Sequence, residues 1–444
     1  MRRREARGQW CLTVARGGAM VRGVRDVLAE PTPSESTASP PAPPGPWAFR
    51  LLCAGSVFNQ AAFWMQQVSM GWLVLELTNS PLQLGLTSFL RGLPMLVLSP
   101  FAGVLVDRLD RRRLALGAQS VLAAGTLLLT LLIMSHWVQA WHAFLFAFVA
   151  GIAVSVSFPA RQAMIPNVVP RAELGRAVAT IAAGQNGARV IAPGFAGLLI
   201  SVSGLATCFG AQATAFLASV LTTWGLPTPP MHRTDTTGVV ATMLAGFQHI
   251  WTSPSLRGLM ILAVVPTVLA LPYQQLLPVF ARDVYQVGPA GLGLLLTANS
   301  TGAFLGAVLA TALMGGHGGW SGLCPPRGLV LLLSGVIVGL GLVLLAAAPS
   351  FPVGLIVLLL TGGAFSVYNA TNNALLHEAT TDAFRGRVMS IYLMTWSLMP
   401  LGTLPAGALA DRVGAPLTVA AGGALCALLV SAVWLSRPVL RQLR

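Results

Sequence analysis

The sequence predicts an all-α polytopic membrane protein with twelve transmembrane helices in two pseudo-symmetric six-helix bundles. Three observations predict this fold. The chain of 444 residues is 55% hydrophobic and has a mean hydropathy of +0.73, which leaves too little polar surface to cover a water-soluble globule. Apolar segments of about 20 residues recur along the chain, each long enough to cross a bilayer core of about 30 Å. The two halves of the chain also resemble each other.

The chain divides into five predicted regions. An arginine- and proline-rich start has the composition of a disordered tail, because it cannot bury a core. We expect this tail over 1–46, an N-terminal bundle over 47–225, a cytoplasmic linker over 226–256, a C-terminal bundle over 257–436 and a basic tail over 437–444. The predicted spans lie at 48–76, 82–106, 114–135, 140–160, 176–201, 205–225, 257–280, 290–313, 328–348, 353–377, 388–409 and 416–435.

The distribution of arginine predicts the orientation of these spans. Arg282 and Arg412 fall in predicted external loops, Arg91 and Arg189 fall within predicted spans, and the other arginines fall in predicted cytoplasmic segments. Positively charged residues favour the cytoplasmic side of a membrane. We therefore predict a multi-pass protein of the cell (inner) membrane with both termini in the cytoplasm. A nucleic-acid partner is excluded, because such a partner needs the cations gathered on one soluble surface.

The second half of the sequence repeats the first at a nearly constant offset. WMQQV at 64–68 aligns with PYQQL at 272–276, and SPLQLGL at 80–86 aligns with GPAGLGL at 288–294. A parallel duplication of this kind is typical of transporters whose halves rock around a shared site. The repeat thus favours a transporter over other polytopic proteins.

Charge is concentrated in one short segment, GVLVDRLDRRR at 103–113. It resembles the loop signature Gly-x-x-x-Asp-Arg-x-Gly-Arg-Arg of the major facilitator superfamily, with Asp110 in place of the usual glycine. The matching residues are Gly103, Asp107, Arg108, Arg111 and Arg112. The resemblance implies that Asp107 contacts the start of span 11, near Gly386 and Arg387, and stabilises the outward-facing state. A topology-fixing anchor is the alternative interpretation.

Span 5 contains a second motif, ARVIAPGFAG at 188–197. It is similar to the Gly-Pro-x-x-Gly-Gly motif of drug antiporters in this superfamily, with alanine at three glycine positions; simple helix packing is the alternative. The residues concerned are Ala188, Ala192, Pro193, Ala196 and Gly197. With RQAMIPNVVPRAELGRA at 161–177, the chain resembles the branch that contains the enterobactin exporter and macrolide efflux proteins. The resemblance implies efflux, driven by protons.

Ionisable residues inside a span are costly and indicate function. Arg91 and Arg189 are predicted to face a central cavity and attract an anionic group of the substrate; a structural role is the alternative. Amides and aromatic rings of other spans are predicted to complete the cavity. The predicted cavity residues are Asn59, Gln60, Phe63, Gln66, Gln67, Arg91, Gln185, Asn186, Arg189, Tyr273, Gln274, Gln275, Asn299, Tyr368, Asn369, Asn372, Asn373 and Trp396.

Other classes of function find little support. The six histidines and five cysteines show no metal-ligand spacing, and no catalytic dyad or phosphate loop is present. We therefore predict no metal, no cofactor and no enzyme activity. No carboxylate falls in the middle of a span, so Asp107, Glu76, Glu378 and His377 are the remaining candidates for proton coupling.

The predicted function is secondary-active export of an amphipathic small molecule, such as a drug, a macrolide or a siderophore. The expected partners are this substrate, protons and the lipid bilayer, and the expected state is a monomer. The alternative is uptake of an anionic metabolite.

Overall fold

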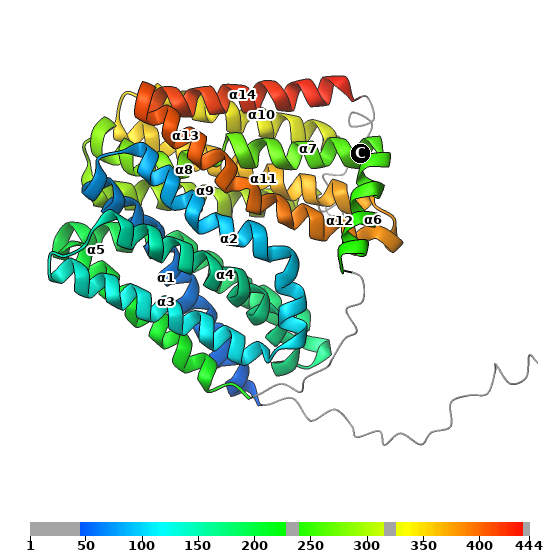
Figure 1. Ribbon diagram of the computed structural model, residues 1–444. Helices are drawn as coiled ribbons and strands as arrows, with labels where there is room; N and C mark the ends of the chain where they lie inside the picture. The colour runs from blue at the N-terminus through cyan, green and yellow to red at the C-terminus, as the bar shows by residue number, and fades with distance from the viewer. Residues whose placement is uncertain (1–44, 228–238, 315–325, 438–444) are drawn as a thin grey trace, which may run out of the picture. The chain divides into compact units, whose positions relative to one another are not determined.

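The computed structural model describes residues 45–227, 239–314 and 326–437, and all regular structure in these ranges is helical (Figure 1). The predicted tails at 1–46 and 437–444 fall almost wholly outside the described residues, as do 228–238 of the predicted linker.

Five long helices form the N-terminal half of the protein. They are α1 (Pro46–Thr78), α2 (Pro81–Arg108), α3 (Arg111–Met134), α4 (Ala140–Val168) and α5 (Leu174–Trp224), with a short 3-10 turn, η1, at Arg171–Glu173. α5 contains both predicted spans 5 and 6. Its backbone leaves the helical region at Gly204, where φ is +84°, a value that a residue with a Cβ rarely adopts. The chain turns there, so α5 crosses the membrane twice.

The C-terminal half has the same six crossings with more interruptions. Span 7 is α7 (Pro254–Leu269), α8 (Tyr273–Val279) and the π-helical η2 (Phe280–Val284). Span 11 is α12 (Asp382–Thr395), η3 (Trp396–Leu398) and α13 (Met399–Val413). The other four are α9 (Gly288–Met314), α10 (Arg327–Ala346), α11 (Phe351–Ala379) and, ending the half, α14 (Ala415–Ser436). The predicted linker contains a further helix, α6 (Val239–Thr252), which packs on α12.

Nine of the described helical segments are long and apolar enough to cross a membrane, with α5 counted once. Two predicted spans are missing from that set for evident reasons. α1 carries Asn59, Gln60, Gln66 and Gln67. Span 11 is divided by η3. Together with the second passage of α5, they complete the predicted twelve crossings.

Equivalent spans contact each other in both halves, as a duplication requires. α2 packs on α4 and α3 packs on α5 in the first half; α9 packs on α11 and α10 packs on α14 in the second. These are the same pairs of spans, 2 with 4 and 3 with 6, counted within each half. The all-α fold of two pseudo-symmetric bundles is confirmed.

The halves meet where glycines allow two backbones to approach. α2 crosses α13 at Gly85 and Gly407, and α5 crosses α9 at Gly197 and Gly293. A Cβ added at Gly197 would lie 2.4 Å from the carbonyl oxygen of Pro289, far inside van der Waals contact. Small residues at such positions are how membrane helices approach closely.

Side chains join the halves beyond these crossings. The Ser80 hydroxyl donates to Asp411 Oδ1 at 2.8 Å, and Arg282 donates to the carbonyl oxygen of Leu75 at 3.1 Å and to Asn79. Asp411, predicted in a loop, lies instead in the last turn of α13. We call this region of the bundle, from the glycine crossings to Ser80 and Asp411, the Asn79 end.

Candidate transport cavity

A cavity of about 460 Å³ lies between the two halves. Helices α1, α2, α4 and α5 and Leu122 of α3 line it from the first half, and residues of α8, α11, η3 and α13 line it from the second. The structure brings the following predicted residues to its wall: Asn59, Gln60, Phe63, Gln66, Gln67, Arg91, Gln185, Arg189, Gln274, Gln275 and Trp396.

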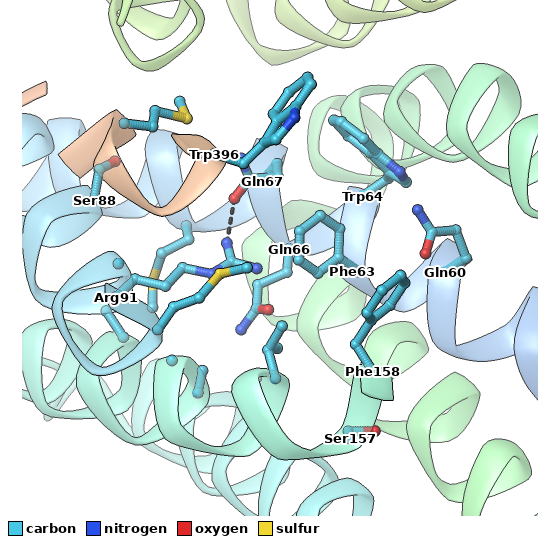
Figure 2. A pocket seen from close by; sticks show the side chains of 18 of the residues that line it. Gln60, Phe63, Trp64, Gln66, Gln67, Ser88, Arg91, Ser157, Phe158 and Trp396 are labelled. Atoms are coloured by element: carbon cyan, nitrogen blue, oxygen red, sulfur yellow. Dashed lines mark hydrogen bonds between the residues drawn. The ribbon is translucent and has the colours of Figure 1, made fainter. Parts of the chain in front are cut away.

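Two aromatic rings of α1 hold the two predicted arginines. The guanidinium carbon of Arg91 lies 4.5 Å from the centre of the Phe63 ring, and that of Arg189 lies 4.9 Å from the Trp64 ring. The two rings meet edge to face with their centres 5.6 Å apart. Arg91 also donates to Gln67 Oε1, the hydrogen bond drawn in Figure 2. α1 therefore positions one cation from α2 and one from α5 on the same wall.

Several polar atoms of this wall are buried without a hydrogen-bond partner. Among the described residues these include Arg91 Nη2, Arg189 Nε, Gln66 Oε1, Asn59 Oδ1 and Trp64 Nε1. Buried polar groups are nearly always paired, so an unpaired group calls for water, an ion or a ligand. Here several such atoms gather around one cavity.

A third arginine, Arg161, is a correction to the sequence analysis. It was placed in the cytoplasmic segment after span 4, but α4 continues to Val168 and Arg161 is only 8% exposed. Its guanidinium donates to the hydroxyls of Ser56 at 2.7 Å and Ser219 at 3.2 Å, and to the carbonyl oxygen of Leu52 at 3.4 Å. Arg161 thereby ties α4 to α1 and α5 at the edge of the cavity.

The segment around Arg161 held a usable signal. Residues 152–168 contain no glycine that would end a helix. The two prolines of this segment, Pro159 and Pro166, lie within α4, because membrane helices tolerate proline. The α4 side chains Ser157, Phe158 and Gln162 also line the cavity and were not predicted there; Gln162 lies beyond the predicted end of the span at 160.

The opposite wall of the cavity is neutral. Phe365 of α11 and Trp396 of η3 meet edge to face with ring centres 6.1 Å apart, and Gln274 and Gln275 of α8 add amides. Figure 2 shows Trp396 across from the α1 side chains Gln67 and Phe63. Cations line only the first half's side of the cavity among its described lining residues.

The remaining predicted cavity residues lie outside this lining. Tyr273 donates to Asn299 Oδ1 at 2.7 Å, and both are buried. Tyr368 donates to the carbonyl oxygen of Leu262 at 2.5 Å, and Asn369 donates to that of Phe365 at 3.0 Å. Other contacts occupy these side chains. Asn372 is buried in α11, Asn373 lies on the same helix, and Asn186 lines a second cavity of about 80 Å³ with Arg189, Ser300 and Ser366.

The charged signature is only partly described. Gly103, Asp107 and Arg108 lie in the last turns of α2, but their side chains fall outside the described part of the chain, so the contact predicted for Asp107 stays a prediction. Asp110 caps α3 by accepting from the backbone N–H groups of Arg112 and Arg113, with φ at −61°. No left-handed conformation is needed there, which explains why aspartate can replace the usual glycine.

The arginines that follow bind within their own half. Arg111 donates to the carbonyl oxygen of Ala163 in α4 at 3.1 Å, and Arg112 donates to that of Trp224 at the end of α5. Cations at the carbonyl ends of helices are favourable. In span 11, Arg387 lies over the Phe384 ring at 5.1 Å, and a Cβ added at Gly386 would meet no atom within 4 Å.

The antiporter-like motif forms the crossing of α5 with α9. Ala188, Ala192, Pro193, Ala196 and Gly197 are all buried. The carbonyl oxygen of Pro193 would lie 2.6 Å from a Cβ added at Gly293, and Thr297 of α9 donates to the carbonyl oxygen of Val190 at 3.1 Å. The motif therefore lies at the interface of the halves, with Arg189 extending from it to the cavity.

Comparison with known proteins identifies the family of this chain. Residues 38–444 match the family described as transmembrane secretion effector. The chain belongs to this family. It is similar to the multidrug efflux pump Tap of Mycolicibacterium fortuitum, with 29% identity over 387 residues that cover 85% of this chain and 92% of Tap.

Two further relatives lie in the branch that the sequence motifs indicated. Macrolide efflux protein A of Streptococcus pyogenes is 23% identical over 372 residues, 82% of this chain and 90% of the relative. The enterobactin exporter EntS of Escherichia coli O1:K1 / APEC is 27% identical over 345 residues, 78% and 80% of the two chains. The predicted branch is confirmed, and the chain is a multi-pass membrane transporter related to efflux proteins.

The fold agrees with solved transporters. A crystal structure of the nucleoside transporter NupG superposes with a TM-score of 0.72 and 14% sequence identity, covering 87% of this chain and 99% of NupG. At this level of identity the likeness establishes the major facilitator fold and nothing about cargo.

Proposed function

We propose that this protein is a secondary-active exporter that moves amphipathic small molecules out of the cytoplasm by alternating access. The observation that carries the proposal is the cavity between two duplicated bundles, because its walls come from both halves and combine amides, cations and aromatic rings. Relative motion of the halves would expose such a site first on one side of the membrane and then on the other.

The conformation supports this mechanism. The glycine crossings and the bonds of Ser80 and Arg282 hold the halves together at the Asn79 end. From there the cavity extends along α4 to Arg161 and Ile165. With the Asn79 end outside, as the arginine distribution favours, this is a conformation in which the external side is closed and cargo enters from the cytoplasm.

Export follows from the family relationship and distinguishes this proposal from uptake of an anionic metabolite. The test uses everted membrane vesicles and right-side-out vesicles that contain the protein, with radiolabelled erythromycin, enterobactin and 2-naphthoate as probes. Export predicts accumulation of at least one probe in everted vesicles only. Accumulation only in right-side-out vesicles would identify an importer instead.

Proton coupling is part of the proposal and is tested in the same vesicles. None of the described residues that line the cavity is an aspartate, glutamate or histidine, so a coupling proton would bind elsewhere, with Asp107, Glu76, Glu378 and His377 as candidates. Collapsing both the pH gradient and the membrane potential with a protonophore such as CCCP is expected to abolish accumulation. Undiminished accumulation after this treatment would exclude protons as the coupling ion.

A further inference from the structure

The charges on the cavity wall have one sign. Arg91, Arg161 and Arg189 line the cavity, and no aspartate or glutamate is among its described lining residues. A cationic solute would enter this region against repulsion, whereas an anionic solute would be attracted. At an effective dielectric constant of 20, two unit charges 4 Å apart interact by about 4 kcal/mol. The wall therefore discriminates between solutes by charge.

Arg161 does not provide the attraction, because its hydrogen bonds are already made. Its donors reach Ser56, Ser219, Thr223 and the carbonyl oxygen of Leu52. A solute would have to replace those contacts before it could accept from this guanidinium. The charge of Arg161 adds to the positive electrostatic potential of the cavity. Its hydrogen bonds hold α4, α1 and α5 together.

Arg91 and Arg189 differ from Arg161 because each has a guanidinium N–H group without a hydrogen-bond partner. Phe63 and Trp64 each pack against one of the two guanidinium groups, and these ring contacts use no N–H group. Arg91 Nη2 and Arg189 Nε are buried and unpaired in the described structure. Preorganised, charged donors with no partner are suited to an acidic group, since charge-assisted hydrogen bonds to carboxylate, sulfonate or phosphate oxygens are about twice as strong as neutral ones.

We propose that the cargo of this transporter is an amphipathic organic anion whose acidic group binds Arg91 and Arg189, while its apolar ring system contacts Phe365 and Trp396. The inference rests on the proposed function, whose cavity it specifies. The edge-to-face pair of Phe365 and Trp396 on the opposite wall offers flat apolar surface with few polar demands. An acidic head and an aromatic body would thus contact both halves at once.

The proposal is tested by equilibrium binding to the purified full-length protein, with two probes that differ only in charge. 2-Naphthoate and 2-naphthamide share one ring system and nearly one shape, and quenching of tryptophan fluorescence or calorimetry measures their affinities. We expect naphthoate to bind the unaltered protein about tenfold or more tightly than naphthamide, a difference of about 1.4 kcal/mol.

Three variants assign that selectivity to the two arginines. Arg91→Gln and Arg189→Gln each replace the guanidinium with a neutral planar amide and are expected to reduce the preference for naphthoate to about threefold or less. The matched control is Arg176→Gln, an exposed arginine of α5 outside the cavity, which is expected to keep the full preference. Thermal unfolding of each variant shows whether it remains folded, and Arg91→Lys and Arg189→Lys, which keep the charge, are expected to restore part of the preference.

Three outcomes would overturn the proposal: equal binding of both probes, no measurable binding of either in the millimolar range, or a preference that survives both glutamine variants. These outcomes leave the export proposal standing, because binding in detergent reports neither direction nor coupling. Conversely, the absence of transport in vesicles would refute export and leave the anion preference intact.

Discussion

Two arginines of the same bundle show how surroundings divide one residue type into two roles. Arg161 and Arg91 both line the cavity from the first half. Arg161 donates to four neighbours on α1 and α5, whereas Arg91 donates to Gln67 and keeps Nη2 unpaired. A guanidinium with paired hydrogen-bond donors holds its bundle together, whereas one with an unpaired donor is, in our proposal, available to bind a solute. The unmade hydrogen bonds of a buried cation therefore identify the binding wall better than its charge does.

The largest effect that this comparison predicts is on stability. Arg161→Leu would remove the hydrogen bonds from the guanidinium to Ser56, Ser219 and Thr223, and hydrogen bonds to charged groups contribute about 1.5–3 kcal/mol each. We expect a loss of about 3 kcal/mol or more in the free energy of unfolding, measured by thermal or denaturant unfolding in detergent. Arg91→Leu is the matched control and should unfold close to the unaltered protein. Equal stability of the two variants would remove the distinction between the arginines.

The next largest effect is on transport, and it tests the contact between α5 and α9 separately from the cavity wall. Gly197→Leu would place side-chain atoms against the backbone of α9, where even a Cβ lies 2.9 Å from the Cα of Gly293. The halves could then not close at the Asn79 end, so we expect transport in vesicles to fall about tenfold or more while the protein inserts normally. Gly187→Leu, on the same helix with no atom within 4 Å of its added Cβ, should transport normally. Normal transport by the Gly197 variant would show that closure does not use this crossing.

A smaller effect distinguishes charge from geometry. In Arg161→Lys the charge remains but one ammonium cannot reach the acceptors on both α1 and α5, so we expect a loss of about 1 kcal/mol in stability. In Arg91→Lys the unfolding free energy should change by less than that, because fewer contacts are lost. Unfolding curves of the two lysine variants measure the difference. A reversed order would mean that Arg91 holds the fold more than its hydrogen bonds indicate.

The smallest effect concerns the exposed bond between Ser80 and Asp411. Because hydrogen bonds at exposed sites contribute little, Asp411→Asn should shift the balance between open and closed Asn79 ends by about 0.5 kcal/mol, or roughly twofold. Labelling of a cysteine introduced at Ser88, which lines the cavity, measures that balance from each side of the membrane. A shift of about tenfold would make this bond a principal latch, which its exposure does not predict.

Much of the fold could be predicted from the sequence, because each segment that crosses a lipid bilayer must be a long apolar helix. Hydropathy and the repeat predicted the twelve crossings and the two bundles. Arg91 and Arg189 could be predicted at the cavity wall, since an unneutralised cation in a span has few other places to lie.

Other features depend on contacts that a single sequence does not encode. Tyr368 is amphipathic and sits in a predicted cavity span, yet its hydroxyl is used by the backbone of α7. The sequence predicts Arg161 in a loop, because a basic residue near the end of a span is typical of a cytoplasmic loop. Which face of a helix meets the cavity is set by rotation against its neighbours, and hydropathy within a wholly apolar helix carries little information about that rotation.

The glycine crossings have a consequence for how such a transporter can change its cargo. At Gly85, Gly197, Gly293 and Gly407 the approach is between main chains, and no side-chain chemistry is involved. If the halves move about these crossings, as we propose, the contact between them does not depend on the solute in the cavity. Replacing rings, amides or cations of the wall would then change which compound is carried without altering the contact between the halves.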